Sequence, residues 1–305
     1  MAKTRGVKGA ASWCALSAIL YLVCRTCLRA LVSAWMGTQV NGASLAHPVG
    51  FSEVTVELLT LLIGALSIAL PVLWVFKTTR LELEDLRLVR PIPWSPGFCI
   101  IVFLGLANVG NILSGLLARV LGMPGRTTTL AAEGPALIVA ILAICILPAV
   151  GEELLFRGAL QGMMRPCGSN VAIFAPALLF ALLHLNLPQF IPALLSGLFL
   201  GRLAERTGSI LPGMLLHLLN NSIAAIDIYL QLYAPENFAM GVELCVLIGF
   251  PIAGAVMLWH AAKQGFSFAD GMRTGARPTA AFTSPAYLVA VVFLGIYTVV
   301  TTFMA

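Results

Sequence analysis

Two adjacent glutamates and an arginine interrupt one of the most apolar stretches of the chain. They lie in the sequence GEELLFRG as Glu152, Glu153 and Arg157. Ionisable residues within apolar spans are costly and mark functional sites by default. Successive residues of a helix turn by about 100°, so Glu153 and Arg157 share a face and can form an ion pair. We therefore predict that Arg157 neutralises Glu153, and that Glu152 points elsewhere and is available for chemistry.

Histidine and asparagine side chains follow in two later apolar stretches. His217 and Asn221 lie four residues apart in HLLNN, and Phe180 and His184 repeat this spacing in FALLH. A carboxylate or an imidazole can take a proton from water, and an amide can donate to a developing oxyanion. If three helices bring these groups to Glu152, the combination suits hydrolysis by an activated water molecule.

Other arrangements and purely structural roles compete with this interpretation. The chain contains neither H-E-x-x-H nor G-x-S-x-G, which excludes a zincin site and a serine nucleophile elbow. A lone histidine within a span more often packs helices than catalyses, and an intramembrane asparagine commonly joins helices. A Glu–Arg pair is also more often structural. The presence of all these residues in consecutive apolar stretches favours a site.

The elements that carry these residues are membrane-spanning helices. Of the 305 residues, 59% are hydrophobic and 10% are charged, whereas a soluble domain has about a quarter charged residues. Several apolar runs reach the roughly 20 residues needed to cross a bilayer, and they lack the alternation of a β-barrel. The sequence predicts an all-α, polytopic transmembrane helical bundle of eight or nine spans.

Nine candidate spans can be placed, of which the sixth is short enough to be half-buried or tilted. They cover residues 10–34, 54–76, 98–121, 136–157, 171–187, 189–203, 209–231, 240–260 and 285–304. The loop-forming residues of 163–170 allow the fourth helix to continue to about that point, which predicts one long helix through 148–162. We expect this helix to bring four side chains into one cavity in the inner half of the bilayer, open to the cytoplasm: Glu152, His184, His217 and Asn221.

The chain divides into three expected parts. These are N-terminal spans over 1–134 with a cytoplasmic amphipathic connection at 77–97, a catalytic helical core over 135–232, and C-terminal spans over 233–305. The most economical structure for the connection is a short amphipathic helix on the inner membrane surface.

The distribution of charge predicts the orientation. Lysine and arginine are concentrated in the segments that lie inside when the N-terminus is cytoplasmic. Arg25 and Arg29, within the first span, have no explanation at this level. The net charge of +5 is the usual basic excess of inner loops, so we expect a lipid bilayer around the chain and no nucleic-acid partner.

The order and spacing of the motifs resemble the CPBP intramembrane proteases, a family with CAAX prenyl endopeptidases and bacteriocin-immunity (Abi-like) proteins. E-E-x-x-x-R, F-x-x-x-H and H-x-x-x-N occur here in that order within roughly 150–222. The resemblance implies that Glu152 activates water with His184, and that His217 and Asn221 stabilise the oxyanion or help to hold a metal. It also implies supporting roles for Glu153, Arg157 and Phe180.

The resemblance leaves the cofactor open. Glu152, His184 and His217 could supply three ligands to Zn²⁺ or another divalent metal, with the open fourth position that a catalytic zinc site requires. Glu152 and His184 could equally act without a metal.

The expected function is that of an intramembrane endopeptidase, a hydrolase and metalloprotease in the metal-dependent case. The short, loop-poor chain is typical of bacteria, which places it in a bacterial cell membrane. Its substrate is then a secreted or bacteriocin-like peptide or another membrane protein. The alternative is a non-enzymatic immunity or scaffold protein that binds a peptide in the same cavity. A transporter is a weaker third hypothesis, because no inverted repeat is visible; the oligomeric state is left open.

Overall fold

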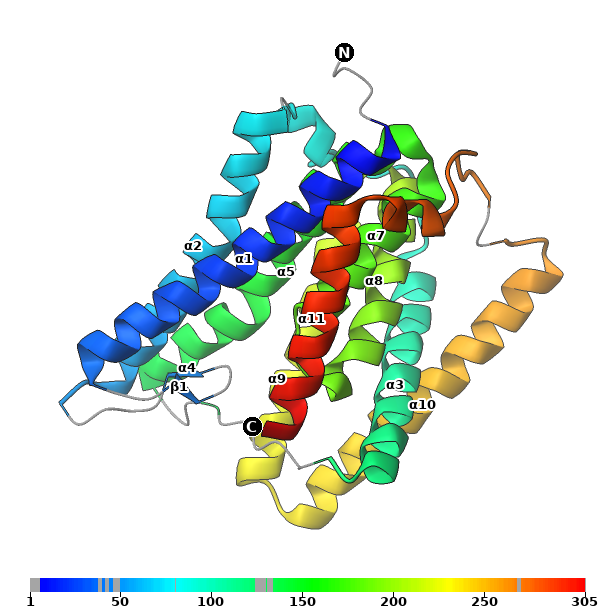
Figure 1. The fold of residues 1–305 in the computed structure, drawn as a ribbon. Helices are drawn as coiled ribbons and strands as arrows, with labels where there is room; N and C mark the ends of the chain where they lie inside the picture. The colour runs from blue at the N-terminus through cyan, green and yellow to red at the C-terminus, as the bar shows by residue number, and fades with distance from the viewer. Residues whose placement is uncertain are drawn as a thin grey trace.

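The computed structural model describes residues 6–37, 40–41, 44–45, 50–79, 81–123, 130, 134–267 and 270–304. They form a bundle of tilted helices (Figure 1). The helices outside the fourth span are α1 (Val7–Met36), α2 (Glu53–Thr79), α3 (Pro96–Leu121), α7 (Ser169–Leu182), α8 (Leu187–Thr207), α9 (Leu211–Tyr233), α10 (Glu236–Lys263) and α11 (Pro285–Met304). Short 3-10 turns form η1 (Leu83–Leu86) and η5 (Pro278–Thr283), and β1 (Val40–Asn41) pairs antiparallel with β2 (Ser44–Leu45).

Within these described ranges, eight helices are long and apolar enough to cross a membrane. This number agrees with the predicted bundle of eight or nine spans. The backbone groups of such helices are satisfied inside each segment, which is what a bilayer demands. The chain is therefore an integral membrane protein.

The fourth span is one continuous helix of 34 residues, from Gly134 to Cys167. The predicted long helix through 148–162 is confirmed. It is not uniform, because two π-helical stretches interrupt it. Its parts are α4 (Gly134–Ile141), η2 (Leu142–Ile146), α5 (Leu147–Glu152), η3 (Glu153–Leu160), α6 (Gln161–Met164) and η4 (Arg165–Cys167). π-helical turns are rare and frequently occur at functional sites.

The short helix is the fifth in chain order and not the sixth, as was expected. The expected short sixth span corresponds to α8, which has 21 residues and is long enough to cross a membrane. Its last turns contain Arg202, Glu205 and Arg206, which interrupt the apolar run from which the span was read. The helix before it, α7, has only 14 residues. At about 1.5 Å per residue, α7 is too short to cross a core of about 30 Å.

The connection at 77–97 is not the expected amphipathic helix. Residues 77–79 are the end of α2, and between Leu81 and Ser95 the structure describes only the four-residue turn η1. Pro91, Pro93 and Pro96 cannot donate to a helix and break any longer one. The rest of the connection runs as a strap along the loop between α8 and α9. The amide of Ile92 donates to the carbonyl of Thr207 at 2.9 Å, and that of Ile210 donates to the carbonyl of Arg87 at 3.1 Å.

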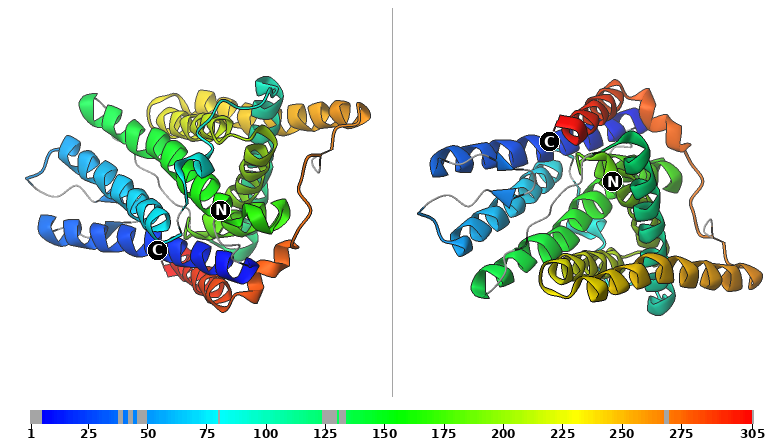
Figure 2. Two further views of the ribbon diagram at one scale, coloured as in Figure 1. Left: turned by 90° about the horizontal axis from the view of Figure 1, so that it is seen from above. Right: turned by 90° about the horizontal axis from the view of Figure 1, so that it is seen from below.

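The core is divided between two groups of helices. Views along the bundle show α1 and α11 together on one side and α10 on the opposite side, with the fourth span between them (Figure 2). One buried cluster joins α1, the fourth span, α7 and α11, and it includes Leu155, Leu179 and Leu294. The other joins α3, α8 and α9, and it includes Phe103, Leu200 and Leu216. The candidate residues lie on the fourth span, on α7 and the turn after it, and on α9, where the two clusters meet.

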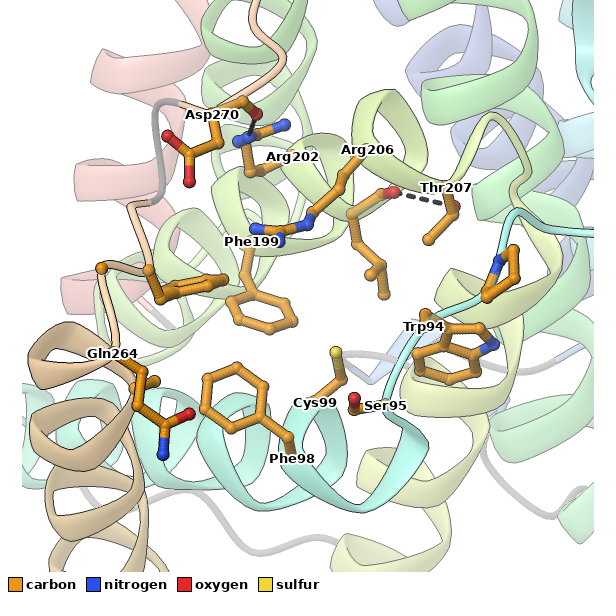
Figure 3. Close-up of a pocket in the computed structure, with 15 residues that line it drawn as sticks. Trp94, Ser95, Phe98, Cys99, Phe199, Arg202, Arg206, Thr207, Gln264 and Asp270 are labelled. Carbon is orange, nitrogen blue, oxygen red and sulfur yellow. Dashed lines mark hydrogen bonds between the residues drawn. The ribbon is translucent and has the colours of Figure 1, made fainter.

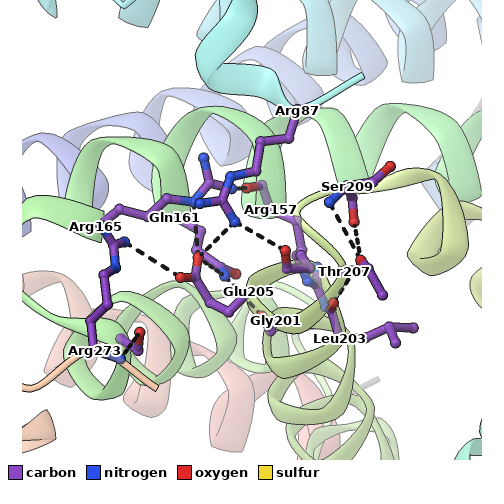
Figure 4. Close-up of polar contacts among 12 residues, drawn as sticks. Arg87, Arg157, Gln161, Arg165, Gly201, Leu203, Glu205, Thr207, Ser209 and Arg273 are labelled. Atoms are coloured by element: carbon purple, nitrogen blue, oxygen red, sulfur yellow. Dashed lines mark hydrogen bonds and ion pairs between the residues drawn. The ribbon is translucent and has the colours of Figure 1, made fainter. Parts of the chain in front are cut away.

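A buried carboxylate fixes one end of the bundle. The side chain of Glu205 on α8 is 4% exposed. It lies 2.9 Å from Nε of Arg165, 3.5 Å from Arg87, 3.4 Å from Arg273 and 3.0 Å from the amide nitrogen of Gln161 (Figure 4). These partners come from the end of the fourth span, the strap and the segment after α10. Glu205 therefore holds together four stretches of chain at what we call the basic end of the bundle.

Small residues allow α3 to approach its neighbours closely. A Cβ atom on Gly110 would lie 2.5 Å from Cα of Pro192 on α8, whereas one on Gly115 would meet no atom within 4 Å. Close contact between small residues is a main source of helix association in membranes.

We therefore expect Gly110→Ala to lower the stability of the detergent-solubilised protein by about 1–3 kcal/mol through overpacking against backbone. Gly115→Ala on the same helix is the matched control and should leave the midpoint of thermal unfolding unchanged or slightly raised. Equal midpoints for the two variants would contradict the close α3–α8 packing.

Candidate functional site

The two glutamates lie where the fourth span changes from α5 to η3. Glu152 is the last residue of α5, and Glu153 is the first of η3. The side chain of Glu152 is 17% exposed, whereas that of Glu153 is fully buried. A buried charge must be paired, so the neighbouring carboxylates occupy different surroundings.

Three groups surround the carboxylate of Glu153. Its Oε1 atom lies 3.2 Å from Nη1 of Arg157 and 3.1 Å from Nδ1 of His217 on α9. Its Oε2 atom lies against Gly213 of α9, where a Cβ atom would come within 3.0 Å. The pair with Arg157 is the one that the spacing predicts. The contact with His217 joins residues 64 positions apart, which no local pattern can reveal.

Phe180 on α7 links the charged groups to both histidines. The guanidinium carbon of Arg157 lies 4.6 Å from the centroid of its ring. The ring centroids of His184 and His217 lie 4.9 Å and 6.0 Å away, both edge to face. Such a cation–π contact is strongest where water is excluded, and Arg157 is buried. Through these contacts Phe180 can hold Arg157 and both imidazoles in place, which is the supporting role expected of it.

His217 lies between the two carboxylates. An ionised carboxylate can only accept, so Nδ1 of His217 donates to Glu153. This leaves Nε2 facing Glu152, whose Oε2 atom is 3.8 Å away. In the neutral ring Nε2 carries a lone pair, and in the imidazolium it carries a second N–H. Histidines that bind a metal commonly donate their other ring N–H to a carboxylate, which fixes the tautomer and the orientation of the ring. Glu153 has this position relative to His217.

His184 is held in a fixed tautomer by its own helix. Its Nδ1 atom lies 2.9 Å from the carbonyl oxygen of Phe180, and a carbonyl only accepts. The proton therefore lies on Nδ1, and Nε2 of the neutral ring is an acceptor. His184 also interacts electrostatically with Glu152 and His217, so the structure brings the three ionisable groups into one neighbourhood.

The turn that carries His184 is supported from α11. It joins α7 to α8 and includes Leu185, a non-glycine residue with φ of 56°, which is a strained conformation. Irregular backbone at membrane depth needs partners within the protein. Thr298 donates to the carbonyl of Leu182, Thr301 donates to that of Leu185, and the hydroxyl of Thr302 accepts from the amide of Leu187.

Asn221 lies one turn beyond His217 on α9, as the spacing predicts, and it reaches a different partner. Its Nδ2 atom donates to the carbonyl oxygen of Ile144 in η2 at 3.3 Å. One N–H of the amide is therefore engaged with the fourth span, and the second is available to another acceptor. No measured contact joins Asn221 to Glu152 or His184.

The first span adds two polar side chains that were not predicted as part of these surroundings. Arg25 on α1 lies 3.3 Å from the hydroxyl of Tyr21, and both interact electrostatically with Glu152. The intramembrane position of Arg25 was the available signal. Its partner could not be read, because α1 and the fourth span are far apart along the chain.

The described side chains do not provide a complete metal site. No three His, Cys, Asp or Glu side chains among them lie close enough together to hold a metal ion. Glu152 and Nε2 of His217 could supply two ligands, while the third expected ligand, His184, does not complete the set in this arrangement.

The difference between the glutamates has a measurable consequence for stability. Glu153→Gln and Arg157→Ala each leave a buried charge uncompensated, so we expect each to lower the free energy of unfolding by roughly 3–5 kcal/mol. Glu152→Gln, at a partly exposed position, is the matched control and should unfold close to the wild-type temperature. Three variants with the same thermal midpoint would contradict the assigned roles.

One comparison with known proteins gives a match. Residues 134–223 match the family model described as type II CAAX prenyl endopeptidase Rce1-like. No protein of curated function and no solved structure matches the chain significantly. The matched segment runs from the start of the fourth span into α9 and contains every candidate residue of the site. This segment, which covers less than a third of the chain, is therefore similar to the CAAX-type intramembrane endopeptidases of the CPBP family.

Proposed function

We propose that this protein hydrolyses peptide bonds of a peptide or membrane-protein substrate with a water molecule activated by Glu152. The observation that carries the proposal is the position of the Glu152 carboxylate, whose Oε2 atom faces Nε2 of His217 at 3.8 Å. Glu153, directly beside it, is already engaged with Arg157 and His217. Glu152 is therefore the carboxylate left to act on a substrate.

The reaction can be written with a single proton carrier. Glu152 takes one proton from water as the oxygen attacks the substrate carbonyl, and a C–O bond forms. The tetrahedral intermediate then collapses, the C–N bond breaks, and Glu152 returns the proton to the leaving amine. General acid–base catalysis of this kind contributes about 10²–10⁴-fold in rate.

The two histidines and Asn221 have distinct places in this scheme. His184, with its proton on Nδ1, presents Nε2 as an acceptor for the second hydrogen of the attacking water. The second N–H of the Asn221 amide donates to the developing oxyanion. His217 is oriented by Glu153, and in its imidazolium form it places an N–H beside Glu152.

A divalent metal would supply Lewis-acid activation of water, held by Glu152, His184 and His217. Because the described side chains do not form a three-ligand set, no step above is routed through a metal. Binding of Zn²⁺ or another divalent ion, which the resemblance left open, is the competing prediction that the chelation experiment below separates from the metal-free steps.

The substrate must reach a site enclosed by membrane-spanning helices. Suitable substrates are membrane proteins, or apolar peptides whose cleavable segment lies near the bilayer. We include secreted and bacteriocin-like peptides in this class and place the protein in a bacterial cell membrane with a cytoplasmic N-terminus.

Loss of the proposed base should abolish cleavage without loss of protein. We expect Glu152→Gln to lower the rate by at least about 10²-fold, and Asn221→Ala by about 10²–10³-fold if it binds the oxyanion. Membranes from cells expressing each variant can be compared by mass spectrometry of new peptide termini. Glu84→Gln, an exposed carboxylate on η1, is the control and should match wild type.

In that comparison, undiminished cleavage by Glu152→Gln would remove Glu152 from the chemistry. If wild type and Glu152→Gln produced the same peptides as cells without the protein, yet both bound a peptide, the immunity or scaffold function would replace the protease.

Metal dependence can be decided with purified protein. From the proposed steps we expect cleavage to continue after a strong chelator has removed all metal, as checked by elemental analysis. Activity that disappears on chelation and returns with Zn²⁺ would contradict the metal-free scheme. Zinc affinity should then fall as the pH is lowered, because imidazole ligands must be deprotonated to bind a metal.

A further inference from the structure

A pocket lies at the basic end of the bundle, away from the candidate residues. It occupies about 460 Å³ between the start of α3, the last turns of α8 and the end of α10. Figure 3 shows Arg202 and Arg206 entering it from α8, with Phe98 and Cys99 facing them from α3. It shares no residue with the group formed by Glu152, His184, His217 and Asn221, so the proposed proteolysis does not explain it.

One part of the pocket wall is aromatic. Phe98 of α3 packs edge to face against Phe266, with 5.5 Å between ring centroids. Phe199 of α8 packs against Phe103 at 5.6 Å, and Trp94 of the strap completes this side. Such a wall suits a hydrocarbon chain, and the indole N–H of Trp94 is the one hydrogen-bond donor among the four aromatic side chains that line the pocket.

The other part of the wall is basic. The guanidinium carbon of Arg206 lies 4.6 Å from the centroid of the Phe266 ring, and the residue is exposed. Arg202 is buried and donates to the backbone carbonyl of Asp270. The one carboxylate on the wall, that of Asp270, accepts from the amide of Ser267 at 3.1 Å. Two guanidinium groups against one carboxylate leave the lining net positive.

The pocket lies at the level where spanning helices end. Near the end of α10, the ammonium of Lys263 lies 3.6 Å from the ring centroid of Trp259, a pairing of residue types that is enriched at the membrane–water interface. Earlier in α10, Ile248, Ile252 and Val256 are exposed, as expected of a face in contact with lipid. The aromatic wall therefore adjoins the hydrocarbon region, and the arginines lie at the depth of the head groups.

We propose that this pocket binds an anionic phospholipid. The phosphate lies against Arg206 and Arg202, because guanidinium groups recognise phosphate oxygens through paired N–H donors. One acyl chain follows Phe98 and Phe199 towards the bilayer. Basic pockets between spanning helices are a known means of binding lipid head groups. The bound lipid joins α3, α8 and α10, and this role is independent of the proteolytic activity.

The proposal can be tested by lipid-dependent thermal stability in detergent. Dioleoyl phosphatidylglycerol should raise the unfolding midpoint of the wild type, and dioleoyl phosphatidylcholine should raise it much less. Arg206→Gln should remove most of the phosphatidylglycerol shift and weaken its apparent Kd by about tenfold or more. Each variant is compared with its own lipid-free midpoint, so a change in basal stability does not affect the result.

Arg277→Gln is the matched control, because Arg277 is an exposed arginine outside the pocket, and it should keep the full shift. The same shift in Arg206→Gln as in Arg277→Gln would overturn the proposal. Inorganic phosphate separates the head group from the lipid as a whole. Stabilisation by phosphate alone, equal to that by phosphatidylglycerol and lost in Arg206→Gln, would make this a phosphate site and overturn the lipid assignment.

Discussion

The burial of one carboxylate, Glu153, sets the geometry on which the site depends. A charge in a region with little water is costly unless it is paired with an opposite charge and accepts hydrogen bonds. Here Arg157 supplies the opposite charge from the same helix, and His217 supplies an N–H from α9. Oε1 of Glu153 contacts both groups and so ties the fourth span to α9 at this level. In this arrangement Nε2 of His217 faces Glu152.

The same physical requirement explains the parts of the fold that seem remote from the chemistry. His184 is carried by a turn between a 14-residue helix and the following span, so its irregular backbone needs partners inside the protein. The hydroxyl groups of α11 provide them. The last span, which carries no candidate residue, is therefore required for the position of one imidazole. At the other end, Glu205 keeps the fourth span, α8 and the strap together through three arginines.

The two polar regions of the bundle differ in their chemical surroundings. Around Glu152 and His217, charged groups are enclosed by helices and face one another. At the basic end, arginines lie beside aromatic rings at the level where the helices end. The first arrangement fits proton transfer on an enclosed substrate, and the second fits contact with an anionic lipid. Both are built on α8 and its neighbours, so lipid at one end can stabilise the helices that carry the site.

The sequence by itself determined the helical membrane class, the long fourth helix and the Glu153–Arg157 pair, because apolar run length and helical spacing are local properties. It also identified the histidines, since charge and imidazole are conspicuous in apolar spans. Only the tertiary structure decided that His217 binds Glu153, that Asn221 reaches the carbonyl of Ile144, and that α7 rather than α8 is short. These features depend on contacts between distant helices and on polar groups at helix ends. Neither periodicity nor hydropathy carries information about which helices become neighbours.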